Sequence, residues 1–210
     1  QLLRRSERSQ EFPRDSIAYR RPGPEYESTR HNLGFWWVDQ LAAAANVSLR
    51  QEARFHGQAA KLVESGHECW LLKPATFMNE SGRSVQALTQ FYKLAPAEML
   101  VVHDELDLPP GEARLKKGGG SAGHNGLKDI AAHLGQEFWR LRIGIGRPSD
   151  RAQMINYVLN RPAKEQLSLI RDAIDRSLAV WALMRDGKAE AARRQFRGIV
   201  IAEHQLGGFR

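Results

Sequence analysis

Hydrophobic and polar positions along the chain follow two different periods, which divide it into helices and strands. From Leu33 to Ala45 the large hydrophobic residues recur every three or four positions, which is typical of an amphipathic helix. From Phe138 to Gly146 hydrophobic residues alternate with arginine or glycine, which predicts a strand. The same patterns predict helices over 33–45, 81–93, 127–134, 163–185 and about 189–196, and strands over 54–63, 67–73, 99–102, 112–117 and 138–146.

The order of these elements indicates the fold class. Strands that alternate with helices favour an α/β fold, here a mixed, twisted β-sheet flanked by helices. A length of 210 residues fits a single large domain of this kind. Residues 1–21 differ from the rest, because they hold six arginines and three acids without a clear period. We expect them to be poorly ordered.

Composition and charge narrow the class of partner and the compartment. The chain carries 31 lysines and arginines against 24 acids, which gives a net charge of +7 and a pI near 9.8. A basic balance favours a polyanionic partner, above all a nucleic acid. No hydrophobic run approaches the roughly 18 residues of a membrane span, and no signal-peptide hydrophobic region is found, so we expect no membrane partner and a cytoplasmic protein. The single Cys69 excludes an internal disulfide and fits a buried thiol.

Two polar clusters supply a base and a carboxylate. His103-Asp104-Glu105 directly follows the predicted strand 99–102, and ligands of α/β sheets bind beyond the carboxyl ends of strands. A carboxylate there can hold an imidazole in one tautomer and raise its basicity. His31 lies just before a predicted helix and could deprotonate a water, and we expect the nearby positive charge of Arg30 to lower its pKa. The alternative is that these are solvated loop acids and a capping or surface histidine.

The segment Phe77-Met78-Asn79 precedes another predicted helix and has two interpretations. Asn79 is a suitable helix N-cap, and Phe77 with Met78 could simply pack against other residues. In a functional site, the Asn79 amide would lie in a cleft with Phe77 and Met78 as its hydrophobic wall.

The glycine-rich stretch from Lys117 to Gly126 has three interpretations. Its spacing fits a dinucleotide fingerprint, but no acid follows about 20 residues later. It also fits a nucleophile elbow at Ser121, but three residues separate that serine from the preceding strand. The plainer interpretation is a mobile loop whose backbone amides attract an anion. Asn125 at its end could donate to a carbonyl or position a water.

Basic residues flank this loop. Arg114, Lys116 and Lys117 precede it, and Arg140 and Arg142 share one face of a predicted strand. Together they would form a basic track for phosphates, which brings affinity without reading sequence; apart, they would be ordinary surface charges. The chain has no cysteine pair, no His-x-x-x-His and no acidic cluster at ligand spacing, so we expect no metal site.

Several of these clusters belong to an ordered series of five motifs. They are Pro22-Gly23-Pro24-Glu25-Tyr26 with Thr29-Arg30-His31-Asn32; Lys73-Pro74 with Thr76-Phe77-Met78-Asn79; His103-Asp104-Glu105-Leu106-Asp107; Gly118-Gly119-Gly120-Ser121-Ala122-Gly123-His124-Asn125-Gly126; and Arg140-Leu141-Arg142-Ile143-Gly144-Ile145-Gly146. This series resembles the bacterial-type peptidyl-tRNA hydrolases. The similarity covers roughly residues 22–200, which would form the domain, and leaves 201–210 as a tail.

The resemblance implies a monomeric α/β domain without metal or cofactor. It implies cleavage of the ester that joins a peptide to the 3′ end of tRNA, which recycles tRNA from aborted translation. His31 would activate water, and Asp104 would orient and polarise His31. Asn79 and Asn125 would hold the peptide and the water or oxyanion. The cleft would be lined by Tyr26, Phe77, Met78 and His124. The tRNA phosphates would be contacted by Arg114, Lys116 and Arg142.

The start of the chain departs from the family pattern. The family begins with an apolar strand that ends in Gly-x-Gly-Asn-Pro-Gly, whereas this chain has Ser16-Ile17-Ala18-Tyr19-Arg20-Arg21 before Pro22. Arg21 therefore stands at the position of the family's active-site asparagine, and a strand is missing from the sheet. This departure predicts low activity. Two alternatives stay open: a catalytically weak RNA-binding relative of the same fold, and a serine hydrolase that uses Ser121.

Overall fold

The computed structural model describes residues 28–64, 66–186, 188 and 190–192. The expectations for residues 1–21, Tyr26 and the tail 201–210 lie outside the described residues, as does most of the helix expected at 189–196. The described strands are β1 (Arg50–Glu52), β2 (Gly57–Glu64), β3 (His67–Pro74), β4 (Leu100–Glu105), β5 (Ala113–Lys117) and β6 (Trp139–Gly144). The α-helices are α1 (Leu33–Ala44), α2 (Ser81–Tyr92), α3 (Asn125–Leu134), α4 (Met154–Leu159), α5 (Lys164–Ala179) and α6 (Trp181–Arg185).

Most predicted elements are found, with two corrections. The strand expected over 99–102 continues to Glu105, so His103-Asp104-Glu105 lies within β4 and not in a loop after it. The long helix expected over 163–185 is divided at Val180 into α5 and α6. The sequence patterns did not predict β1, α4 or the short 3-10 helices, among which Arg30–Asn32 (η2) and Met78–Glu80 (η4) carry residues of the site.

The six described strands form two sheets of three strands each. In the first, β1, β2 and β3 pair antiparallel in that order. In the second, β6 lies in the centre, parallel to β4 and antiparallel to β5. The α/β class with mixed strand pairing is therefore confirmed, and the strands that the structure describes form two sheets where one was expected.

A cavity of about 890 Å³ separates the two sheets where β3 and β4 face each other. Consecutive residues of both strands line it, from Glu68 to Leu72 on β3 and from Leu100 to Asp104 on β4. Among the described strands, β3 pairs only with β2 and β4 pairs only with β6. His31, Asp104 and His124 are among the residues that line the cavity, so it reaches the site described below.

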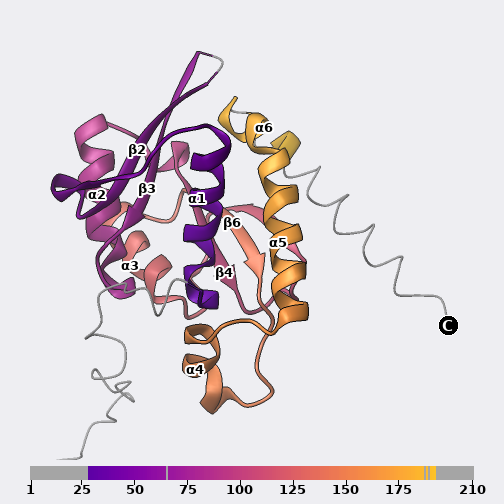
Figure 1. The fold of residues 1–210 in the computed structure, drawn as a ribbon. Helices are drawn as coiled ribbons and strands as arrows, with labels where there is room; N and C mark the ends of the chain where they lie inside the picture. The colour runs from indigo at the N-terminus through magenta and orange to yellow at the C-terminus, as the bar shows by residue number, and fades with distance from the viewer. Residues whose placement is uncertain (1–27, 65, 187, 189, 193–210) are drawn as a thin grey trace, which may run out of the picture.

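Helices cover the sheets on both faces (Figure 1). On one face α1 and α5 bury a core that includes Trp37, Leu141 and Ile174, each at most 2% exposed. On the other face α2 packs on α3, and a smaller core contains Leu127 and Phe138. The alternation of β6 explains this division, because Leu141 and Ile143 enter the first core while Arg140 and Arg142 point to the opposite face.

The close approach of α1 to β4 depends on Gly34. A Cβ atom at this position would lie 2.3 Å from the carbonyl oxygen of Val102, far inside van der Waals contact. Because His31 lies three residues before Gly34 and Asp104 two residues after Val102, this contact sets how closely the two side chains can meet.

Replacing Gly34 with alanine is expected to destabilise the protein by roughly 1–3 kcal/mol, because overpacking at the buried contact outweighs the better helix propensity of alanine. Urea unfolding followed by circular dichroism measures this free energy. Gly120→Ala is the matched control, since a Cβ there meets nothing within 4 Å. Equal unfolding free energies for the two variants would contradict the role assigned to Gly34.

Candidate active site

The centre of the site is a hydrogen bond between His31 and Asp104. His31 Nδ1 lies 2.9 Å from Asp104 Oδ1, although 73 residues separate the two along the chain. The Asp104 side chain is 3% exposed at the end of β4, and His31 reaches it from η2 just before α1. Because an ionised carboxylate only accepts, His31 donates from Nδ1, and its Nε2 is the nitrogen that can take a proton.

His124 reaches the same carboxylate oxygen from another side. Its Nε2 lies 3.2 Å from Asp104 Oδ1, and its Nδ1 accepts the backbone N–H of Leu127 at 3.3 Å, which caps α3. Since Nδ1 accepts, the proton of a neutral His124 sits on Nε2 and points at Asp104. The sequence assigned His124 to the lining of a cleft, and the structure adds this bond.

Burial and charge act in opposite directions on the pKa values of the pair. Burial lowers the pKa of His31, but the charge and the hydrogen bond of Asp104 outweigh it and raise the pKa above its ordinary value of 6.5. Burial raises the pKa of Asp104, but His31 and His124 outweigh it and hold this pKa well below its usual range. The expectation that Arg30 lowers the pKa of His31 is therefore wrong. The Arg30 guanidinium points away, toward the end of α4.

His103 is a buried neutral imidazole beside the site, for which the sequence suggested no separate role. Its Nδ1 donates to the backbone oxygen of Asp104 at 2.7 Å, and its ring lies 5.1 Å from that of His124 in an edge-on arrangement. Burial and the neighbouring His124 lower its pKa to about 3. A histidine that stays uncharged supports the carboxyl end of β4 without competing for the charge of Asp104.

The amide and hydrophobic residues of the expected cleft lie on two segments that contact each other, η4 and the start of α3. Met78 lines the cavity, and its sulfur lies 2.7 Å from the place of a Cβ on Gly126. Phe77 is half-buried, while Asn79 and Asn125 are exposed. Asn79 does not cap α2, because Glu80 holds that position and no side chain caps this helix. Both amides are therefore exposed beside Met78 and Gly126, which line the cavity.

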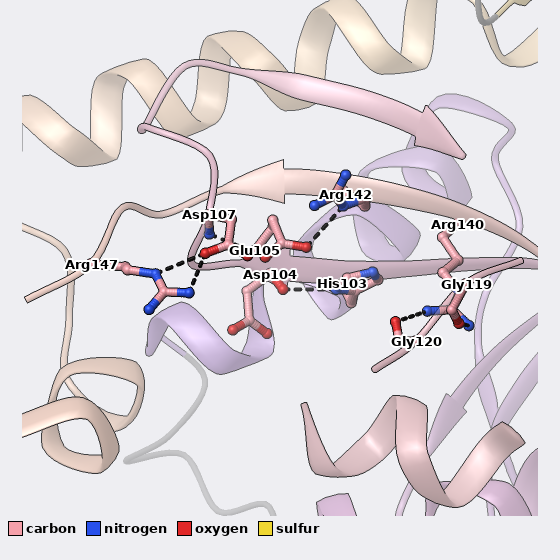
Figure 2. Close-up of polar contacts among 9 residues, drawn as sticks. All are labelled: His103, Asp104, Glu105, Asp107, Gly119, Gly120, Arg140, Arg142 and Arg147. Atoms are coloured by element: carbon pink, nitrogen blue, oxygen red, sulfur yellow. Dashed lines mark hydrogen bonds and ion pairs between the residues drawn. The ribbon is translucent and has the colours of Figure 1, made fainter. Parts of the chain in front are cut away.

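The basic residues of β5 and β6 form two cross-strand pairs on one face. Arg114 lies opposite Arg142, and Lys116 lies opposite Arg140. Three of these cations are engaged internally: Arg140 binds the carbonyls of Gly119 and Gly120, Arg142 binds Glu105 at 2.8 Å, and Arg114 binds Glu112 at 2.8 Å. Figure 2 shows Arg142 meeting Glu105 on one side of β4, while Asp104 points to the other. Lys116 is exposed and makes no ion pair with a described residue.

The glycine loop gives no support to a serine nucleophile. A nucleophilic serine needs a base within hydrogen-bond reach, and in the described part of the chain no side chain bonds Ser121 Oγ. The backbone oxygen of Ser121 instead accepts the N–H of His124 at 2.9 Å, which shapes the turn before α3.

A metal ion has one candidate group of ligands among the described residues, formed by His31, Asp104 and His124. Their ligand atoms lie within 4.8 Å of one another. The hydrogen bonds already engage these atoms. The N–H of Leu127 donates to His124 Nδ1, so the proton of His124 lies on Nε2, the nitrogen that faces Asp104. We therefore describe the group as a carboxylate with two N–H donors.

Known proteins resemble this chain in both sequence and architecture. The sequence model described as Peptidyl-tRNA hydrolase matches residues 20–203. The chain belongs to the peptidyl-tRNA hydrolase family. A peptidyl-tRNA hydrolase of Nitrosospira multiformis is 56% identical over 172 residues, which cover 81% of this chain and 90% of the relative. One from Methylobacillus flagellatus is 57% identical over 173 residues, or 81% and 89% of the two chains.

Solved structures of peptidyl-tRNA hydrolases have the same fold. The crystal structure of the peptidyl-tRNA hydrolase from Acinetobacter baumannii matches with a TM-score of 0.82 at 45% identity, over 83% of this chain and 89% of that one. In this member of the peptidyl-tRNA hydrolase family, none of the described helices is both long and apolar enough to cross a bilayer.

The raised pKa of His31 predicts the acid side of the pH profile. For a reaction in which His31 is the base, activity is expected to fall as the pH drops through a midpoint above 6.5, because a base must be neutral to accept a proton. Asp104→Asn removes the charge that raises this pKa, so the midpoint is expected to move to lower pH while the maximal rate falls. Cleavage rates measured across a pH series give the maximal rate and the midpoint, and NMR titration of the His31 ring gives the midpoint independently. A midpoint unchanged in Asp104→Asn would contradict the pairing.

Proposed function

We propose that this chain hydrolyses the ester between peptide and tRNA with His31 as the general base. The observation that carries the proposal is the 2.9 Å bond between His31 Nδ1 and the buried Asp104, which leaves His31 Nε2 to act on water. An ester of a ribose hydroxyl is already activated, so one base and a few amide donors suffice. No covalent intermediate is required.

The proposed reaction has two steps. A water oxygen attacks the ester carbonyl carbon while its proton passes to His31 Nε2, and a tetrahedral intermediate with a negative oxygen forms. The bond from that carbon to the ribose oxygen then breaks, and the ribose oxygen takes the proton back from His31. Asp104 stabilises the imidazolium between the steps, as buried carboxylates do in triads of this kind. The amides of Asn79 and Asn125 would donate to the peptide or to the oxyanion.

The remaining assignments follow from the family and from the basic face. Arg114, Lys116 and Arg142 would contact tRNA phosphates, and His124, Met78 and Phe77 would line the peptide cleft. The product, free tRNA, returns to translation, and we propose that a monomer acts in the cytoplasm. Tyr26 and Arg21 lie outside the described residues, so the role of Tyr26 and the low activity expected from Arg21 stay predictions.

Replacing His31 with alanine is expected to reduce the cleavage rate by about 100- to 10,000-fold, the usual contribution of a general base, while tRNA binding stays within about twofold. A cleavage assay with a labelled peptidyl-tRNA and a filter-binding assay separate the two effects. His133→Ala is the matched control, because His133 also lies beside a carboxylate, that of Asp129, but on α3 and away from the site.

Each alternative function predicts a different result in the same assays. Salt-sensitive tRNA binding without cleavage by the unaltered chain would favour the RNA-binding relative. Loss of cleavage in Ser121→Ala, together with labelling by a serine-reactive phosphonate, would favour the serine hydrolase.

The basic face gives a separate prediction for Lys116. Replacing Lys116 with glutamine is expected to weaken the binding of all tRNAs to a similar extent, whatever their sequence. It is also expected to reduce the slope of log K, where K is the binding constant, against log salt concentration by about one unit. Binding measured across a salt series gives this slope. Lys61→Gln is the control, because Lys61 pairs with Glu68 on the β2–β3 hairpin. Equal slopes for the two variants would remove Lys116 from the phosphate contacts.

A further inference from the structure

Arg30, the residue before the proposed base, is enclosed in the protein and does not face the site. It is 6% exposed, and its backbone N–H donates to Asn160 O at 3.2 Å. Its guanidinium binds the last turn of α4 and the chain that follows it: Nη1 lies within 3.1 Å of three backbone oxygens and Nη2 donates to a side chain at 2.8 Å. The acceptors are Tyr157 O, Asn160 O, Arg161 O and Gln166 Oε1.

A second set of contacts connects Arg30 to the strand that carries Asp104. The guanidinium carbon of Arg30 lies 4.0 Å from the centre of the Tyr157 ring. The Tyr157 hydroxyl donates to Ile145 O at 2.5 Å, and the Ile145 N–H donates to Glu105 O at 3.0 Å. Glu105 directly follows Asp104. In Figure 1, α4 lies beyond the lower end of α1, where these contacts are made.

These contacts and the catalytic pair form a closed ring. It runs from His31 to Arg30, across Tyr157 to Ile145 and Glu105, and back through Asp104 to His31. We propose that Arg30 and Tyr157 are positioning residues that hold His31 at hydrogen-bond distance from Asp104, an inference that rests on the proposed function. The two side chains touch neither the imidazole nor the carboxylate, and they act by fixing the two backbone segments that carry them.

The local structure of His31 explains why such a support is needed. His31 lies in a 3-10 helix of three residues that leads directly into α1, and the hydrogen-bond geometry of a 3-10 turn is poorer than that of an α-helix. A general base must stay within a few tenths of an ångström of its working position, and a displacement of about 1 Å can cost on the order of a hundredfold in rate. The His31 imidazole is held by its bond to Asp104 and by a tilted contact with the His124 ring at 4.9 Å. The contacts through Tyr157 instead fix the backbone segments that carry His31 and Asp104.

The chemistry of the support requires arginine. A guanidinium is planar, so it can stack on Tyr157 and at the same time present several donors to the carbonyls at and after the end of α4. A lysine ammonium at position 30 keeps the charge but can reproduce only part of this arrangement. Arg30→Lys therefore separates the loss of geometry from the loss of charge.

The test compares Tyr157→Phe and Arg30→Lys with two matched controls. Tyr92→Phe removes a hydroxyl from a ring that stacks on Trp70, outside the site. Arg185→Lys alters an arginine that is 7% exposed and bound to Glu64 and Asp186. For each folded variant, NMR titration of the His31 ring gives its midpoint, and the cleavage assay gives kcat and KM separately.

In Tyr157→Phe we expect the His31 midpoint to move from its raised value toward the ordinary value of about 6.5, kcat to fall by roughly tenfold, and KM to change less than twofold. Arg30→Lys should show larger changes in the same directions, and both controls should match the unaltered protein. Unchanged midpoints in both test variants would overturn the proposal. Because the titration needs no substrate, it decides the positioning role even if the chain cleaves no peptidyl-tRNA.

Discussion

The site depends on one buried carboxylate, that of Asp104. An ionised group enclosed to this degree is stable only if its neighbours supply hydrogen bonds and compensating charge. Here two imidazoles donate to the same oxygen atom, one from η2 just before α1 and one from the N-cap of α3. The requirement to bring both to the end of β4 accounts for the close approach at Gly34 and for the histidine at the helix cap. The geometry of the proposed catalytic pair and the satisfaction of a buried charge thus rest on the same set of contacts.

Local sequence patterns predicted those parts of the fold in which neighbouring residues decide the structure. The period of three to four in α1 and the alternation in β6 reflect one buried face each, so both elements were placed within two residues of their bounds. The polar run His103-Asp104-Glu105 reads as a loop, yet it extends β4, because distant segments supply partners for two of its side chains. His31 and His124 bond Asp104, and Arg142 binds Glu105. Such disagreement between local pattern and structure is expected at functional sites.

The sequence predicted which residues form the candidate site better than it predicted their pKa values. The family resemblance paired His31 with Asp104, but the direction of the His31 pKa shift depends on where the Arg30 side chain points, which no local pattern specifies. The division of the strands into two sheets, with a cavity between β3 and β4, likewise depends on pairing between distant residues. The basic face was foreseen as a set of arginines and lysines, whereas its internal ion pairs required knowledge of which strands are adjacent.

The contact of Arg140 with the glycine loop determines the polarity of that loop. Its guanidinium holds the carbonyl oxygens of Gly119 and Gly120 against the protein (Figure 2). In a trans peptide unit the carbonyl and the following N–H point in opposite directions, so the N–H groups of Gly120 and Ser121 are turned away from Arg140. A buried cation in this way orients two peptide dipoles with their positive ends away from its own charge, so a run of glycines can offer backbone donors where it has no charged side chain.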